Sequence, residues 1–301
     1  MSRVGLILLF LILSSLLFLT WRVPSSEILV SFRFPELLSA LSFGSTLAVS
    51  GAVFQNTLRN PLAEPYTLGV ASASALGAVL SLLINLRPEL GAVLFSSLSV
   101  LIIWFAGKLF KNTFSILLFG VGINALFSAL ILFSYALIPS YTLTDAIYVT
   151  LGFITPPSLK VSLLLVLLSL LTLVLGLYFK REVELLPLGS EIAYFSGVDS
   201  EGALLKLLVL FSLPVAVFIS LFGIVGFVGI VVPHLVRLLG FRVGKAFILL
   251  NYLLGGALLI FSQFLSREVL YPTLLPVGVV TALFGAPAFI YLLWRYSGAR
   301  G

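Results

Sequence analysis

Nine apolar runs, separated by short charged segments, follow one another along the chain. They cover residues 4–21, 37–58, 65–86, 90–107, 112–144, 161–179, 207–233, 246–266 and 269–294. A helix of about 20 apolar residues crosses a bilayer core about 30 Å thick, and each run approaches or exceeds that length. No run alternates apolar and polar residues as a membrane β-strand does. The pattern therefore predicts an all-α, polytopic membrane protein, whose helices satisfy the backbone hydrogen bonds that lipid cannot.

The composition agrees with this pattern. Of the 301 residues, 60% are hydrophobic and 9% are charged, and the mean hydropathy is +1.23. These values lie far outside the range of a water-soluble domain. The first run follows Arg3 as a secretory signal would, but it is long for a signal core and no small-x-small cleavage site follows it. We therefore expect it to be a retained first span.

The basic residues predict the topology, because Lys and Arg accumulate in short cytoplasmic loops. If the run 207–233 crosses the membrane once, eight basic residues lie inside and nine outside, which is no bias. If its segment LFGIVGFVG (221–229) divides it into two short spans, 12 of the 17 basic residues lie inside. We therefore expect ten transmembrane helices with both termini cytoplasmic. The polar segment RNPLAEP (59–65) then lies at the inner end of the second span.

Residues for catalysis or metal binding are scarce. The chain has no cysteine, and its one histidine, His234, lacks the second histidine of a zinc protease motif. The segment GFRVGKA (240–246) is one residue short of a phosphate loop and has Ala246 in place of the hydroxyl residue that binds magnesium. All acidic residues lie in or beside expected loops, so a proton relay lacks its residues, although a sodium site of backbone carbonyls remains open. We expect no catalytic site, metal or cofactor on this chain.

The longest charged stretch, residues 180–206, lies between the sixth and seventh spans on the inner side. Within it, Ser190 can cap a short helix SEIAYF, Glu191 suits the positive N-terminus of that helix, and Gly197 can end it. An apolar helix face in water favours a protein partner. Three residues would form that face: Ile192, Tyr194 and Phe195. The alternative is an ordinary solvated loop.

Four long motifs in one order resemble the permease subunits of type II ABC importers for ferric siderophores, haem and cobalamin, the FecCD-type family. They are RFPELLSALSFGSTLAVSGAVFQNTLRNPLAEPYTLGVASASALGA (33–78), LPLGSEIAYFSGV (186–198), GIVGFVGIVVPHLVRLLG (223–240) and LPVGVVTALFGAPAFIYLL (275–293). The resemblance implies that residues 1–301 form a single transmembrane permease domain with ten helices. It also implies a bacterial or archaeal cell (inner) membrane as the location, with membrane lipid around the chain and no nucleic acid.

The partners implied by the resemblance are a second copy of the chain, two cytoplasmic ABC ATPase subunits that bind ATP and magnesium, and a periplasmic or lipid-anchored substrate-binding protein. The coupling segment, about residues 180–206, would contact the ATPase. Its matching residues are Leu188, Gly189, Ser190, Glu191, Ala193, Gly197 and Val198. The inner gate of the family aligns with Asn112 and Thr113.

A signature turn interrupts the motif 33–78. Pro61 and Pro65 cannot continue a helix and Asn60 favours a turn, so we expect a stiff reversal at the inner face. By resemblance, this turn with Asn60, Pro61, Glu64 and Pro65 belongs to the pathway-lining half of the subunit. A turn kept only for packing is the alternative.

Three charged residues match the outer docking surface of the family. By resemblance, Arg33 and Arg267 match the first and third of the arginines that pair with glutamates of the binding protein, and Glu36 stands in place of the second and reverses its charge. We expect all three to be exposed, with Arg33 and Arg267 attracting the partner and Glu36 opposing it, at about 0.2–1 kcal/mol per pair. Alternatively, they only anchor helix ends at the lipid headgroups.

The expected function is the permease subunit of an ATP-driven importer. A self-sufficient secondary carrier or channel is the alternative from another class, and a membrane scaffold is a third. The family offers an iron chelate, haem, cobalamin or molybdate as substrate, and the sequence does not choose among them.

The incomplete phosphate loop generates a first prediction. The purified chain alone should neither bind nor hydrolyse ATP, because Ala246 and the short spacing leave no site for the phosphates. Addition of the ATPase partner should give hydrolysis, measured as phosphate release. ATP turnover by the isolated chain would contradict the importer interpretation.

Overall fold

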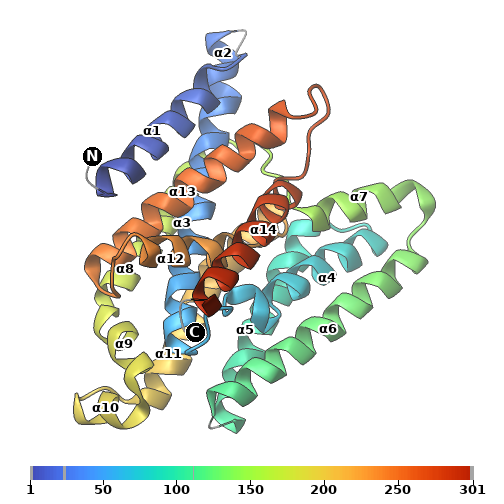
Figure 1. Cartoon of the computed structure of the whole chain (residues 1–301). Coiled ribbons are helices and arrows are strands. Elements are labelled where there is room, and N and C mark those ends of the chain that lie inside the picture. The colour runs from blue at the N-terminus through green and yellow to red at the C-terminus, as the bar shows by residue number, and fades with distance from the viewer. Residues whose placement is uncertain (1–2, 23–24, 111, 299–301) are drawn as a thin grey trace.

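All regular structure in the described part of the chain is helical, which confirms the predicted fold class. The computed structural model describes residues 3–22, 25–110 and 112–298 (Figure 1). Within these residues, seven helical segments are long and apolar enough to cross a membrane. They are α1 (Arg3–Thr20), the continuous segment Ser26–Thr57, α5 (Pro88–Leu109), α6 (Thr113–Leu137), α8 (Leu159–Tyr178), α11 (Ser200–Phe222) and α13 (Lys245–Glu268).

The segment Ser26–Thr57 consists of α2 (Ser26–Ile28), a π-helical turn η1 (Leu29–Arg33) and α3 (Phe34–Thr57). Three more helices hold shorter apolar stretches: α4 (Val70–Leu83), α12 (Val228–Leu238) and α14 (Val277–Gly298). Together these helices occupy the positions of the expected spans. The number of membrane crossings and the side on which the termini lie stay predictions.

The long run 207–233 is divided as expected, because α11 ends at Phe222 and α12 begins at Val228. Gly223 has a φ of +74° and Phe227 a φ of +68°, so the chain leaves the right-handed helical region at both ends of the break. The amide of Phe153 donates to the carbonyl of Phe222 at 2.8 Å and satisfies one of the free groups at the end of α11.

Other expected boundaries differ from the structure. The run 112–144 does not form one helix, because α6 ends at Leu137 and a separate helix α7 (Ser140–Leu151) follows. The proline ring of Pro139 cannot continue α6, and it places the residue before it in an extended conformation. The run 269–294 likewise becomes helical only at Val277.

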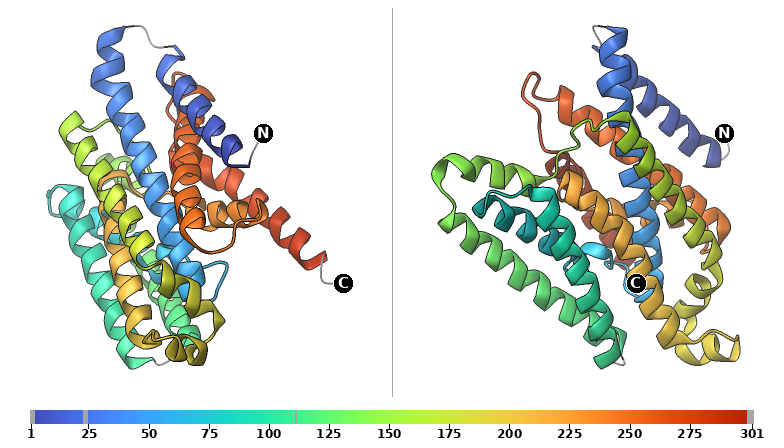
Figure 2. Two further views of the ribbon diagram at one scale, coloured as in Figure 1. Left: turned by 90° about the vertical axis from the view of Figure 1, so that its left-hand side faces the viewer. Right: turned by 180° about the vertical axis from the view of Figure 1, so that it is seen from behind.

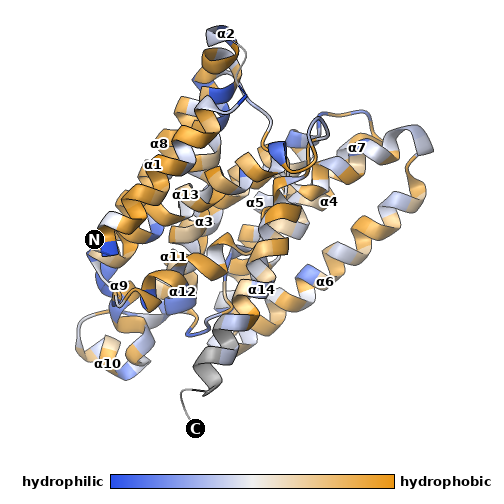
Figure 3. Cartoon of the chain, turned by 45° about the horizontal axis from the view of Figure 1, so that its top comes forward, coloured by the Kyte–Doolittle hydropathy of each residue, from blue (hydrophilic) through white to orange (hydrophobic). Residues whose placement is uncertain are grey.

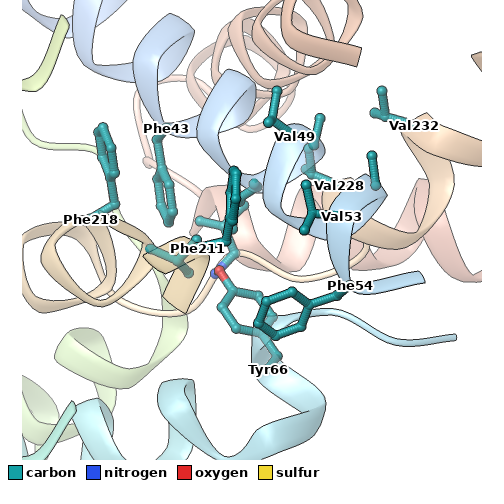
Figure 4. Close-up of a cluster of buried hydrophobic side chains, with 14 of the residues drawn as sticks. Phe43, Val49, Val53, Phe54, Tyr66, Phe211, Phe218, Val228 and Val232 are labelled. Atoms are coloured by element: carbon teal, nitrogen blue, oxygen red, sulfur yellow. The ribbon is translucent and has the colours of Figure 1, made fainter. Parts of the chain in front are cut away.

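Helix α3 lies at the centre of the molecule, and nearly all of its residues are buried. In Figure 2 it runs between α13 on one side and α8 and α11 on the other, and it also contacts α12. Phe43 of α3 stacks on Phe218 of α11 with ring centroids 5.1 Å apart (Figure 4). Hydrophobic residues cover much of the outer faces of α1, α6 and α8, as Figure 3 shows, which suits helices in contact with lipid.

Small residues allow α3 to approach its neighbours at backbone distance. A Cβ atom on Gly44 would collide with the carbonyl of Gly255 in α13, and one on Gly51 would collide with the carbonyl of Gly229 in α12. Gly77 of α4 and Gly91 of α5 face each other in the same way. Helices in lipid associate through this close packing, since lipid is as apolar as their side chains.

The contact between Gly44 and Gly255 generates a second prediction. Gly44→Val should lower the stability of the protein in detergent by about 1–3 kcal/mol, because backbone atoms of α13 cannot move away as a side chain could. Gly122→Val on α6 is the matched control, since a Cβ at that position meets nothing within 4 Å. Thermal unfolding would measure both variants, and equal losses would show that close packing at Gly44 does not hold these helices.

Candidate coupling and transport site

The coupling segment folds into three short helices at one end of the bundle (Figure 1). These are α9 (Lys180–Leu185), the 3-10 turn η3 (Leu186–Leu188) and α10 (Ser190–Phe195). The short helix SEIAYF is thus confirmed, and Gly197 has the expected left-handed conformation with a φ of +80°. The predicted capping role of Ser190 is wrong: the N-cap is Gly189, which has a φ of +123°, and Ser190 is the first helical residue.

Helix α10 presents an apolar surface to its surroundings. The residues Tyr194 and Phe195 are 73% and 87% exposed, and Ile192 is about half exposed, whereas Ala193 points into the protein and is buried. The two aromatic rings lie edge to face with centroids 6.0 Å apart. Acidic residues surround them in a shallow hollow: Glu191, Asp199 and Glu201. Exposed aromatic side chains of this kind are typical anchors of a protein interface.

Hydrogen bonds hold α10 in place at both ends. The guanidinium of Arg181 donates to the carbonyl of Ser196 at 2.6 Å, and the hydroxyl of Ser200 donates to the carbonyl of Ser190 at 3.2 Å. The amide of Val198 returns to the carbonyl of Ala193 at 2.8 Å, which closes the end of the helix. Helix α10 is therefore joined by hydrogen bonds to the segments on both of its sides.

The signature turn between α3 and α4 is the stiff reversal that its prolines predict. The side-chain oxygen of Asn60 accepts a hydrogen bond from the amide of Leu62 at 2.9 Å. Pro65 then begins a 3-10 helix, η2 (Pro65–Leu68), in which the Thr67 hydroxyl donates to the carbonyl of Glu64 at 2.7 Å. Pro61 lies inside the turn. The role of this turn in lining a transport pathway stays a prediction.

The signature turn packs against the break between α11 and α12, although the two motifs are far apart in sequence. The Tyr66 hydroxyl points into the buried cluster in Figure 4 and accepts a hydrogen bond from the amide of Val225 at 3.3 Å. The Glu64 carboxyl lies beside the first turn of α12, where a Cβ atom on Gly229 would come within 2.7 Å of its oxygen. Gln55 of α3 donates to the carbonyl of Gly229 at 3.0 Å. Through these contacts the signature turn and the break between α11 and α12 pack together as one buried region.

Glu64 is buried, although it lies in a loop between two helices. This burial raises the pKa of the Glu64 carboxyl to about 8. Burial therefore favours the protonated, uncharged form of this carboxyl. Sequence reasoning grouped Glu64 with the loop residues and missed its burial, because the turn folds back under α12.

The expected gate residues lie at the beginning of α6. Asn112 is the N-cap of this helix, and its side-chain oxygen accepts a hydrogen bond from the amide of Ser115 at 2.9 Å. Asn112 and Thr113 line a cavity of about 530 Å³ together with Arg59 and Leu186. The structure thus brings the expected gate, the end of α3 directly before the signature turn and the coupling segment to one place. The gating role of Asn112 and Thr113 stays a prediction.

The three charged residues expected on an exposed docking surface have a different environment. Glu36 is fully buried, and both of its carboxylate oxygens accept hydrogen bonds from the guanidinium of Arg267. Gln263 donates to the same carboxylate at 2.6 Å. Arg33 is also buried, with its guanidinium 3.8 Å from the carboxylate of Glu268. The expectation that all three residues are exposed is therefore wrong for Glu36 and Arg33, and Arg267 is only partly exposed. Glu36 is not a free charge that opposes docking, while docking through Arg33 and Arg267 stays a prediction.

Comparison with known proteins agrees with this geometry. Residues 6–295 match the FecCD transport family. The chain belongs to this family. The haemin transport permease HmuU of Yersinia pestis is 33% identical, with 93% of this chain and 88% of that protein covered. The vitamin B12 import permease BtuC of Vibrio vulnificus is 32% identical, with 91% and 85% covered.

A solved structure of a metal-chelate type ABC transporter in an inward-facing conformation also resembles this FecCD protein. It superimposes with a TM-score of 0.88 at 25% identity, and the alignment covers 97% of this chain and 98% of the other. This FecCD protein is accordingly a multi-pass membrane permease of the ABC importer class, and not a self-sufficient carrier or channel.

The buried pair of Glu36 and Arg267 generates a third prediction for this FecCD protein. Glu36→Ala should lower its stability by about 3–5 kcal/mol, because the partly buried guanidinium loses its partner. The double variant Glu36→Ala with Arg267→Ala should lose less than Glu36→Ala alone, since no charge is then left unpaired. Thermal unfolding in detergent would test this, with the exposed Glu27→Ala as control. Additive losses in the double variant would contradict a coupled pair.

Proposed function

We propose that the chain is the membrane subunit of an ATP-driven importer that acts as a pair of identical subunits around a central pathway. In this proposal two ABC ATPase subunits bind at the cytoplasmic face and hydrolyse ATP with magnesium, and a periplasmic or lipid-anchored binding protein delivers the substrate at the outer face. The chain itself carries no cofactor and forms a single transmembrane domain. Membership of the FecCD transport family supports this proposal over a carrier that works alone.

The observation that carries the proposal is helix α10. It combines an exposed aromatic surface with hydrogen bonds that fix both of its ends. An apolar helix face that is rigid and solvent-exposed favours a protein partner, because burial of that face releases free energy at little cost in ordering. The partner that fits a permease of this family is the ATPase.

The proposed topology has ten membrane crossings with both termini cytoplasmic. The ten helices described above supply the crossings, and the basic residues then concentrate on the side of the coupling segment. Helices α4, α12 and α14 hold apolar stretches shorter than the other seven, and in this proposal each of the three makes one of the ten crossings.

The proposed substrate is a metal-containing chelate such as a ferric siderophore, haem or cobalamin. The names of relatives support this proposal: HmuU is named for haemin and BtuC for vitamin B12. FhuB of Salmonella typhimurium, which is 30% identical over 40% of its length, is named for iron(3+)-hydroxamate. Purification of the chain with its binding protein, followed by mass spectrometry of the bound ligand, would identify the substrate.

The exposed surface of α10 generates a fourth prediction. Replacement of Tyr194 and Phe195 by serine should weaken binding of the ATPase by at least about 30-fold, since loss of a single buried aromatic anchor worth about 2 kcal/mol already gives that factor. Membrane insertion should be unchanged, because both side chains point away from the protein. Tyr141→Ser, which removes an aromatic ring 84% exposed on α7, is the matched control.

The substitution Gly197→Val tests the same proposal by changing the backbone at the end of α10 and leaving its exposed side chains in place. A β-branched residue is strained by roughly 1 kcal/mol or more at a φ of +80°, so α10 should lose its fixed end and bind the ATPase less well. Normal assembly of both the aromatic double variant and Gly197→Val would show that the segment is only a linker, and the proposal would fail.

A further inference from the structure

Arg59 at the end of α3 has an unusual backbone conformation and a specific side-chain contact. Its φ is +50°, a left-handed value that non-glycine residues rarely adopt. Its side-chain Nε donates a hydrogen bond to the carbonyl oxygen of Leu186 at 2.8 Å. Leu186 is buried and begins η3, the turn directly before the coupling helix α10. The contact thus joins two segments 127 residues apart.

The space around this contact is not filled by packed side chains. The cavity of about 530 Å³ described above lies between the end of α3, the beginning of α6 and the coupling segment. Apolar side chains that are not in close contact transmit little force between the segments that carry them. A hydrogen bond from a charged donor has a defined direction and length, so it resists displacement both ways.

The signature turn, which directly follows Arg59 in the chain, packs on α6. A Cβ atom on Gly120 of α6 would lie 2.7 Å from the side chain of Leu68 and 3.0 Å from the carbonyl of Thr67. The side chain of Ile123 lies 3.1 Å from the Cβ position of Gly69. Backbone of the turn and backbone of the helix therefore touch, and one cannot shift far without the other.

We propose that Arg59 is a positioning residue that transmits displacement of the coupling helix to the signature turn, and through the turn to α6. This inference rests on the proposed function, because the displacement comes from the ATPase bound at α10. The path consists of the Leu186 carbonyl, the Arg59 side chain, the turn 60–69 and the face of α6 at Gly120. Arg59 links the site of ATP-driven movement to the helix that begins at the expected gate.

The alternative is that Arg59 only stabilises the turn. A glycine at this position distinguishes stabilisation of the turn from transmission of movement. Glycine adopts a φ of +50° without strain, so Arg59→Gly keeps the turn while it removes the guanidinium. Arg59→Lys keeps the charge and a donor of similar reach. Arg242→Gln, in the loop between α12 and α13, is the matched control for loss of a basic side chain.

The experiment uses the complex of the chain with its ATPase subunits in lipid nanodiscs. Since the chain has no cysteine, Gly122→Cys introduces one thiol on α6 at a position with open space around it. The rate of maleimide labelling at this thiol, with and without ATP and vanadate, measures the response of α6 without any transported substrate. ATP hydrolysis is measured in parallel.

We expect the nucleotide-dependent change in labelling rate to fall at least about fivefold in Arg59→Gly, the lower range of measured couplings between sites, while assembly and ATP hydrolysis persist. Arg59→Lys should recover part of the response, and Arg242→Gln all of it. An unchanged response in Arg59→Gly would overturn the inference, as would the lack of any response when Arg59 is present. Loss of assembly and hydrolysis in Arg59→Gly would assign Arg59 a structural role only. A chain that never assembles with the ATPase would instead refute the proposed function.

Discussion

The close approach of α3 to its neighbours is the constraint on which the rest of the structure depends. In lipid, helices gain little from burial of apolar surface, so they associate through backbone proximity and a few polar contacts. Gly44 and Gly51 allow α13 and α12 to lie directly against α3, and the Ser45 hydroxyl donates to the carbonyl of Tyr252 at 2.7 Å. Because α3 is held in this way, the segments that contact its two ends are positioned relative to one another.

At those two ends the structure places its main polar contacts. Near the first turn of α3, the buried carboxylate of Glu36 binds Arg267 at the end of α13. Beyond the last turn, Arg59 binds the carbonyl of Leu186 in the coupling segment. Between them, Gln55 donates to the first carbonyls of α12. Helix α3 therefore connects the pair of Glu36 and Arg267, the helix break and the coupling segment.

Breaks in the helices are concentrated where the chain can satisfy the polar groups that they leave free. The break after α11 receives a hydrogen bond from Phe153 at 2.8 Å, and its Val225 amide binds the Tyr66 hydroxyl. An unpaired backbone group in lipid costs several kcal/mol, so such breaks occur only inside the protein. This explains why the signature turn and the break lie together, since each supplies partners that the other needs.

The sequence by itself determined the all-helical fold, the positions of the apolar helices, the division after Phe222 and the short helix of the coupling segment, because each depends on local hydropathy, glycine or proline. Only the tertiary structure decided which charges are buried: Glu36 reads as an exposed residue at a helix end until Arg267, 231 residues away, is placed beside it. The burial of Glu64 and the bond from Arg59 to Leu186 were decided in the same way. Such pairings depend on which helices pack together, and that arrangement arises from contacts across the whole chain.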